Sequence, residues 1–342
     1  MSLAGMIRLA ERLPTPDALV RAGIGALVGR TSRKLVIAND GQERRFVEGM
    51  NRFPIAIHTD DANAQHYEVP AAFFEVVLGP HRKYSCCLFD APGIPLATAE
   101  ARALDETMAH ADLRDGMSIL ELGCGWGSLS LEMATRFPGA HIVSVSNSAS
   151  QRAAIEARAA ERGLRNLTVV TADMNTFAPQ GRFDRIVSVE MFEHMSNWTE
   201  LLRRCGTWLH PTGRLFLHVF THRHASYRFA HDDPADWIAQ HFFTGGIMPA
   251  HDLPHRFETL FSVEREWRWN GMHYARTARC WLENFDRHEA QIDAILRPLY
   301  GSDTALWKQR WRWFFLATEG LFGHADGNVW GVGHYLMSPV GK

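Results

Sequence analysis

The sequence predicts a doubly wound α/β fold, in which helices cover both faces of a mostly parallel β-sheet. Three observations carry this prediction: apolar runs typical of buried strands, helical segments between them, and a glycine-rich loop after the first run. The strand-like runs are Met117–Leu122, His141–Ser146, Leu167–Thr171, Phe183–Val189 and Arg214–Phe220. Strands that alternate with helices form βαβ units, which build a parallel sheet.

Helices are expected between these runs at Ser128–Phe137, Ser148–Arg162 and Trp198–Leu209. Each is followed within a few residues by Gly or Pro, which end helices. Earlier in the chain, apolar residues with helical spacing follow Pro16-Asp17, and a short helix is expected over Pro70–Leu78. After Phe220 the pattern changes to a His- and aromatic-rich segment.

The last third of the chain is expected to close and cover the sheet. A strand is expected near Phe261–Glu266, helices over about 275–296 and 303–322, and a closing strand over Asn328–Met337. We therefore expect an N-terminal helical extension over 1–65 and a main domain over 66–342. Within that domain, 221–260 and 270–325 are expected to form a cap over the site.

Composition limits the class of protein. The 36 Lys and Arg residues are balanced by 38 Asp and Glu, which argues against nucleic acid as a partner. No run of 18 apolar residues exists, so no transmembrane segment is expected, and the first fifteen residues lack the apolar core of a signal peptide. Five cysteines in no CxxC pair are typical of free thiols in a reducing compartment, so a cytoplasmic location is expected.

The glycine-rich loop is the strongest local signal. It runs Glu121-Leu122-Gly123-Cys124-Gly125-Trp126-Gly127, directly after the first strand. A dinucleotide fingerprint would need Gly or Ala where Ser128 stands, and the Gly-Lys-Ser/Thr of a P-loop is absent. An acidic residue followed by three alternating glycines resembles the S-adenosylmethionine (AdoMet) loop of class I methyltransferases. A purely structural strand–helix turn is the alternative.

Polar residues after the next two strands suit the same cofactor. Asp173 follows the third strand and is expected to accept a hydrogen bond from the adenine amino group, with Met174 against the ring. The second strand ends at Ser146, followed by Asn147 and, one helical turn later, Gln151. Most class I methyltransferases have an acidic residue here that binds the ribose, so amides at this point are a distinguishing departure.

Seven motifs in order resemble one branch of the Rossmann-like class I methyltransferases. The branch holds the cyclopropane fatty acid and mycolic acid cyclopropane synthases together with the plant coclaurine-type N-methyltransferases. The motifs are His66–Pro70, Tyr84–Cys87, the glycine loop, Ser146-Asn147 with Gln151, Glu190–Met195, Phe242–Gly246 and His273–Ala275. The resemblance implies an AdoMet-dependent methyltransferase domain over 66–342.

The resemblance also implies roles for individual cofactor residues. Tyr84 and Ser85 are expected at the methionine end of AdoMet, and Asn147 and Gln151 at its ribose. Asp173 and Met174 are expected at the adenine. The full expected cofactor set is Tyr84, Ser85, Glu121, Gly123, Gly125, Gly127, Asn147, Gln151, Asp173, Met174 and Val189.

Two kinds of reaction are compatible with this branch. In cyclopropane synthases a Cys, Glu, His and Tyr hold a bicarbonate that acts as base, and Cys86, Glu193, His218 and Tyr274 match them. The additional acid Glu190 and the motif 242–246 are more similar to the coclaurine-type enzymes. We therefore favour methyl transfer to a small acceptor, most readily an amine nitrogen. Methylene transfer to an unsaturated acyl lipid, with bicarbonate, is the alternative; a non-catalytic AdoMet-binding protein is disfavoured.

Proton-handling residues follow the fourth strand. His194 is expected to accept the proton of the amine, Glu193 to orient His194 or share its proton, and Glu190 to attract the ammonium form. If this segment is helical, Glu190 and His194 share a face, and two carboxylates beside the imidazole would raise its pKa. The alternative is a solvent-exposed turn in which these Glu and His residues have no catalytic role.

The remaining candidates could equally be core residues. Cys86, His218 and Tyr274 are catalytic candidates, whereas the aromatic residues Phe220, Phe243 and Trp330 are expected, with Glu190, to bind the acceptor. No metal is expected, because the His residues at 218, 222 and 224 fit no zinc signature. The sequence leaves the oligomeric state open, with a homodimer as one expectation.

Overall fold

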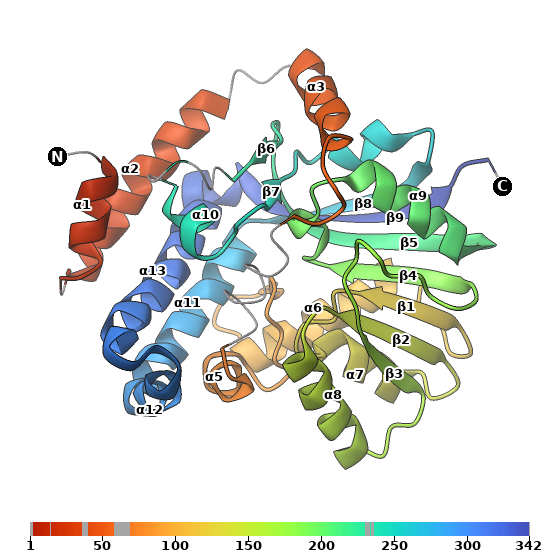
Figure 1. Cartoon of the computed structure of the whole chain (residues 1–342), viewed down its shortest axis with the longest axis horizontal. Coiled ribbons are helices and arrows are strands. Elements are labelled where there is room, and N and C mark those ends of the chain that lie inside the picture. The colour runs from red at the N-terminus through yellow and green to blue at the C-terminus, as the bar shows by residue number, and fades with distance from the viewer. Residues whose placement is uncertain are drawn as a thin grey trace.

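A computed structural model describes residues 3–13, 15–35, 40–57, 69–229, 233 and 236–341 of the chain. Its centre is a seven-stranded sheet of order β3-β2-β1-β4-β5-β9-β8, which Figure 1 shows from bottom to top. The strands are β1 (Ser118–Leu122), β2 (His141–Ser146), β3 (Leu167–Thr171), β4 (Phe183–Val189), β5 (Leu209–His222), β8 (Phe261–Asn270) and β9 (Trp330–Pro339). The first five are parallel, and β9 and β8 add antiparallel pairs. The predicted doubly wound fold is confirmed.

Helices cover both faces of this sheet. On one face α6 (Leu96–His110) and α7 (Ser128–Arg136) pack Leu104 and Leu129 against Ile119 of β1. On the other face α9 (Trp198–Trp208) packs against the strands, next to α3 (Asp40–Met50). Helix α8 (Ala149–Glu161) lies against β2 and β3. The expected helices between strands are present, and α3 falls within the helical extension expected over 1–65, whereas α6 was not predicted.

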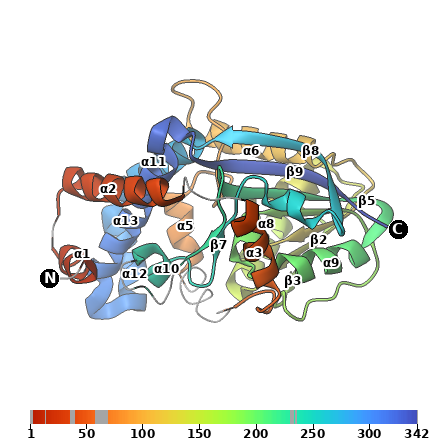
Figure 2. The ribbon, with the colours of Figure 1, turned by 90° about the horizontal axis from the view of Figure 1, so that it is seen from above.

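A helical lobe packs beside the sheet, on the left in both Figure 1 and Figure 2. It contains α1 (Leu3–Ala10), α2 (Asp17–Leu35), α5 (Ala71–Val77), α10 (Trp237–His241), α11 (Met272–Arg287), α12 (Glu289–Tyr300) and α13 (Thr304–Gly323). Arg312 of α13 links α2 to α11, because it contacts both Asp17 at 2.9 Å and Asp286 at 2.7 Å. The single helix expected over 275–296 is two helices that meet at His288.

Short elements complete the chain. They are β6 (Tyr227–Arg228), β7 (Ile247–Met248) and the 3₁₀ turns η1 (Phe192–His194), η2 (Leu253–Phe257), η3 (Gly301–Asp303) and η4 (His324–Gly327). The boundary expected at residues 65 and 66, and the motif residues His66, Tyr67 and Glu68, lie outside the described residues. In the part of the chain that is described, no helix is long and apolar enough to cross a membrane.

Candidate active site

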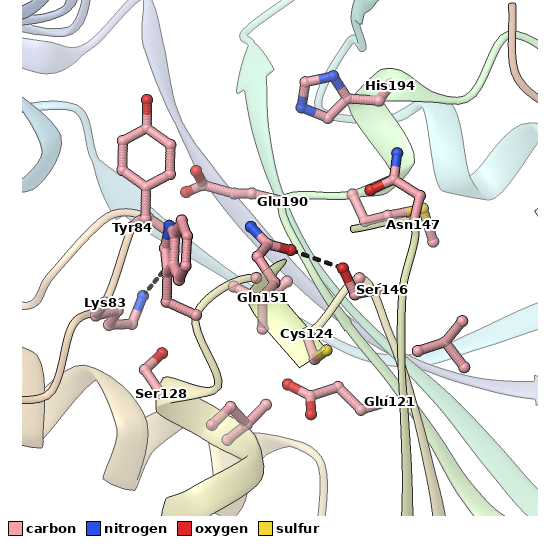
Figure 3. A pocket seen from close by; sticks show the side chains of 18 of the residues that line it. Lys83, Tyr84, Glu121, Cys124, Ser128, Ser146, Asn147, Gln151, Glu190 and His194 are labelled. Atoms are coloured by element: carbon pink, nitrogen blue, oxygen red, sulfur yellow. Dashed lines mark hydrogen bonds between the residues drawn. The ribbon is translucent and has the colours of Figure 1, made fainter. Parts of the chain in front are cut away.

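A pocket opens where the parallel strands β1, β2 and β4 end, which is where ligands bind in open α/β sheets. Figure 3 shows side chains from the loop before α6, the glycine loop, β2 and the segment after β4 around one space. The expected site residues that line it are Tyr84, Ser85, Glu121, Gly123, Gly125, Asn147, Gln151, Asp173, Met174, Val189, Glu190, His194, Phe220, Phe243 and Tyr274.

The glycine loop forms the floor of this pocket, and its glycines are needed for two different reasons. Gly123, Gly125 and Gly127 all have positive φ angles, which L side chains rarely adopt. A Cβ at Gly127 would lie 2.6 Å from Ile155, so this glycine permits close packing of α7 on α8. A Cβ at Gly125 would meet no atom within 4 Å and would project into the pocket that Gly125 lines.

Glu121 ties the loop to its neighbours. Its buried carboxylate accepts hydrogen bonds from the hydroxyls of Ser130 on α7 and Ser144 on β2, the latter at 2.7 Å. Burial raises the pKa of this carboxyl, and the two serine donors oppose that rise. Glu121 therefore supports the geometry of the loop as well as lining the pocket.

Gln151 presents an unsatisfied donor to the pocket. Its Oε1 accepts from the Ser146 hydroxyl at 2.7 Å, as Figure 3 shows, whereas its buried Nε2 has no hydrogen-bond partner. A buried amide N–H without a partner is costly, so a ligand oxygen is the natural acceptor. The indole Nε1 of Trp126 is a second unpartnered buried donor on the same pocket. These two donors fit a ligand rich in hydroxyl and carboxylate oxygens, as AdoMet is.

Glu190 is the meeting point of the catalytic candidates. It follows β4 in a left-handed conformation, with φ of +48°. Its carboxylate accepts from the Cys86 N–H at 3.0 Å and the Tyr274 hydroxyl at 2.6 Å, and Nε2 of His218 lies 3.2 Å away. Burial raises the pKa of Glu190, and Lys83, Cys86 and Tyr274 act in the opposite direction.

The contacts of Glu190 argue against bicarbonate as a cofactor, which was the alternative expected from the sequence. Three of the four residues that the resemblance assigned to bicarbonate, namely Cys86, His218 and Tyr274, meet instead on the carboxylate of Glu190. The fourth, Glu193, has its Oε1 bonded to the Phe220 N–H at 2.6 Å. An anion bound by the protein would compete with a carboxylate that already uses these donors, so the residues present do not fit bicarbonate.

The expected pairing of Glu193 with His194 is also wrong. Glu193 is fully buried, its Oε2 has no partner, and burial followed by repulsion from Glu190 raises its pKa well above the usual range. Only the 3₁₀ turn η1 follows β4, so Glu190 and His194 do not share a helical face. His194 nevertheless lines the pocket, with its ring stacked on Phe243 at 4.8 Å between centroids.

Other candidates lie behind the pocket rather than on it. The Cys86 thiol is buried, and burial raises its pKa well above the usual range. The hydrogen bond of this residue to Glu190 is made by its backbone N–H. His218 is fully buried behind Glu190. Trp330 was expected to bind the acceptor, but it is buried in the core with its Nε1 on the Tyr227 hydroxyl at 3.3 Å.

Lys83 is a pocket residue that the sequence analysis missed. It is 1% exposed, and its ammonium donates to the Ser85 hydroxyl and the Cys86 carbonyl, both at 2.6 Å. A buried cation needs compensating charge, and the nearby carboxylates of Glu190 and Glu100 supply it. In the sequence, the one sign that Lys83 lies at the pocket is its position directly before Tyr84, an expected cofactor residue.

A second, mainly apolar cavity of about 860 Å³ adjoins the first. The two share Phe220, Phe243, Tyr274 and Phe314, and the second extends between α2, α10 and α13. Among the described residues, no group of three or more His, Cys, Asp or Glu side chains is arranged to hold a metal ion.

The fold and the pocket together define a class I AdoMet-dependent methyltransferase. The family model of mycolic acid cyclopropane synthetase matches residues 56–330. The chain belongs to this family, as the motifs predicted.

Known proteins place the chain more closely within that family. It is 32% identical over 301 residues to the (S)-coclaurine N-methyltransferase of Thalictrum flavum subsp. glaucum, covering 85% of this chain and 82% of the relative. A crystal structure of coclaurine N-methyltransferase bound to N-methylheliamine and SAH, the demethylated product of AdoMet, matches with a TM-score of 0.93 at 28% identity. It covers 98% of this chain and 99% of that chain. A cyclopropane mycolic acid synthase of Mycobacterium tuberculosis is 28% identical over 251 residues, covering 70% of this chain and 86% of the relative.

Proposed function

We propose that this enzyme transfers the methyl group of AdoMet to the nitrogen of a small amine that carries an apolar body. The observation that carries the proposal is the Glu190 carboxylate, held in the pocket by Tyr274, the Cys86 N–H and His218. An anion built into the pocket suits an ammonium group, which must be bound and then deprotonated before its lone pair can react. The similarity to coclaurine N-methyltransferase supports the same acceptor class.

AdoMet, when bound, supplies an electrophilic methyl group. The residues expected to hold it are those of the loop and of β2, with Gln151 Nε2 and Trp126 Nε1 as the unpaired donors. Glu190 attracts the ammonium form of the acceptor, and His194, which lines the same pocket, accepts its proton. Phe220 and Phe243 provide an aromatic wall on which a cationic amine gains cation–π attraction.

The adjoining cavity supports an acceptor with a large apolar part. Its walls include Trp237 and Trp313, and it opens onto the pocket beside Tyr274. Such a space would let the nitrogen lie at Glu190 while the rest of the acceptor leaves water, which contributes binding free energy through apolar burial.

A single acceptor screen tests the proposal. The purified enzyme is incubated with AdoMet and either secondary amines on apolar ring systems or vesicles of unsaturated phospholipid, and products are identified by mass. We expect N-methylated amines, no dependence on added bicarbonate, and a loss of about 10²–10³ in kcat/KM for Glu190→Gln, because the anion that attracts the ammonium group is removed. The exposed Glu258→Gln is the matched control. Methylene transfer to the phospholipid, or full activity of Glu190→Gln, would overturn the proposal.

We also propose a cytoplasmic location, which the five free cysteines support. Recovery of the native protein in the membrane or secreted fraction would contradict it.

A further inference from the structure

A row of three imidazoles connects Glu190 to the far side of the sheet. His218 on β5 and His334 on β9 are direct cross-strand partners, with Nδ1 of His218 2.8 Å from Nε2 of His334. Nδ1 of His334 lies 2.7 Å from Nδ1 of His110, the last residue of α6. At one end Nε2 of His218 lies 3.2 Å from Glu190 Oε1, and at the other Nε2 of His110 lies 3.0 Å from Glu106 Oε2. We call His218, His334 and His110 the histidine chain.

The histidine chain is buried along most of its length. His218 and His334 are fully buried, and the ring of Trp269 lies 4.3 Å from that of His334. Trp267 stacks on His110 at 3.8 Å with an angle of 10° between the rings. Only the outer end reaches solvent, because the side chain of Glu106 is 46% exposed.

Burial, with a smaller contribution from nearby cations, favours the neutral form of all three rings. Burial lowers the pKa of all three residues, to about 4 for His110 and well below the usual range for the two others. Lys83 disfavours protonation at the inner end, and Arg265 disfavours it at His110. The two acids that face the chain are Glu190 and Glu106, one at each end.

A neutral imidazole has one N–H donor and one acceptor nitrogen, so the N–H groups of the histidine chain can all point in one of only two directions. With every N–H pointing inward, His110 Nδ1–H donates to His334, and His334 Nε2–H donates to His218. His218 Nε2–H then donates to Glu190, which is a carboxylate. In this state Nε2 of His110 is an acceptor and cannot bond an ionised Glu106, whose half-exposed side chain turns to water instead. With every N–H pointing outward, Nε2 of His218 is an acceptor, and Glu190 must be a protonated acid that donates to it.

We propose that His218, His334 and His110 are positioning residues that hold Glu190 as a carboxylate and couple its protonation to the protein surface at Glu106. The inference rests on the proposed function, because the histidine chain acts through Glu190. It goes beyond that function because it assigns a role to residues that do not touch cofactor or acceptor.

A proton can pass from the surface to Glu190 along the histidine chain without leaving a charged imidazole in the core. A proton binds to Nε2 of His110, and the Nδ1–H of His110 passes to Nδ1 of His334. The Nε2–H of His334 passes to Nδ1 of His218, and the Nε2–H of His218 passes to Glu190 Oε1. Each ring gains one N–H and loses another, so one proton added outside becomes one proton on Glu190. The step is reversible, and it remains available when cofactor and acceptor close the pocket.

Nitrogen NMR tests the direction of the chain without any acceptor. The full-length protein, labelled with ¹⁵N at histidine and saturated with S-adenosylhomocysteine, is titrated from neutral to acid pH. We expect the Nε2–H form of His218 and His334 at neutral pH and scalar couplings across both N–H···N bonds. On acidification both rings should change to the Nδ1–H form together. Imidazolium signals, an Nδ1–H form of His334 at neutral pH, or absent couplings would overturn the proposal.

A substitution at the outer end tests the consequence for catalysis. His110→Phe keeps a ring against Trp267 but removes both nitrogens, and the exposed His141→Phe is the matched control. The variant shortens the row of hydrogen bonds that ends on the Glu190 carboxylate, so the carboxylate is stabilised less and its pKa should rise. The acid limb of the kcat/KM profile should therefore move to higher pH by roughly half a unit to one unit. S-adenosylhomocysteine affinity should stay within about twofold. An unmoved acid limb, or the same movement in His141→Phe, would contradict the role. The NMR result still stands if the amine proposal itself fails.

Discussion

The hydroxyl of Tyr274 donates to Oε2 of Glu190 at 2.6 Å, although the two residues come from different parts of the fold. Tyr274 lies in the first turn of α11 in the helical lobe, whereas Glu190 follows the central strand β4. The helical lobe therefore contributes directly to the electrostatics of the group that we expect to bind the acceptor.

Removing this hydroxyl should shift the pH profile. Its hydrogen bond lowers the pKa of Glu190, so Tyr274→Phe should raise that pKa and move the acid limb of kcat/KM to higher pH. A charge-assisted hydrogen bond is strong, so kcat/KM near neutral pH should fall about tenfold. The stack of the ring on Phe322, at 4.3 Å, is retained, so the melting temperature should change little. Tyr300→Phe, at the end of α12, serves as control; an unmoved acid limb would count against the contact.

Two alanine substitutions in the glycine loop should have different consequences. Gly127→Ala places a Cβ 2.6 Å from Ile155 and should cost about 2–4 kcal/mol of unfolding free energy. Gly125→Ala meets no protein atom, so it should cost only about 1–2 kcal/mol of backbone strain. It should weaken S-adenosylhomocysteine binding at least about tenfold, because its methyl projects into the pocket. Urea unfolding and calorimetry check both; equal effects of the two changes would disprove this division.

Stability should fall as the pH rises from about 4.5 to about 7, because of Glu100. This buried carboxyl accepts from the N–H groups of His81 and Lys83, and burial raises its pKa to about 7. Between the unfolded value of 4.5 and about 7, the folded state binds more protons than the unfolded state. The stabilisation is therefore complete below pH 4.5 and is lost by about pH 7, on the order of 2 kcal/mol.

The matched variant for this prediction is Glu100→Gln, which cannot titrate. Its unfolding free energy, measured in urea at several pH values, should lack this fall even if its absolute stability is lower. Glu258→Gln, at an exposed position, should keep the wild-type slope. A Glu100→Gln variant with the wild-type slope would assign the pH dependence to another group.

Narrowing the apolar cavity should discriminate between acceptors. Gly23 of α2 lines that cavity, and a Cβ there meets no atom within 4 Å. Gly23→Leu should raise KM for bulky amines by about tenfold and leave small amines unaffected. The helix itself should gain up to about 1 kcal/mol. Gly25→Leu, in the same helix with equally open space but off the cavity, is the control. Equal KM changes for large and small amines would contradict the assignment.

The sequence predicted the central sheet well because burial of parallel strands leaves a local trace. The runs at His141–Ser146, Leu167–Thr171 and Phe183–Val189 coincide with β2, β3 and β4. Helix α6 was missed because its Ala-rich sequence shows little apolar periodicity, although Ala99 and Leu104 are fully buried. The strands against which α6 packs come later in the chain, so the local sequence does not predict that the helix is buried there.

The chemistry of the site depended on pairings across the sheet that spacing does not reveal. Glu190 and Glu193 are three residues apart, yet the left-handed backbone at Glu190 sends their carboxylates to Tyr274 and to the Phe220 N–H respectively. His334 went unnoticed because its significance comes only from its register with His218. The cofactor residues stay predictions, but their convergence on one pocket follows from the strand ends that carry them.

The wall that α2 contributes to the apolar cavity separates recognition from reaction along the chain. The groups that we expect to hold the donor and handle the proton come from the sheet, its loops and α11, whereas α1 and α2 line only the cavity that we propose for the distal part of the acceptor. Exchange of this opening segment between relatives would thus be a route by which new substrate ranges arise in evolution while the reacting groups stay untouched.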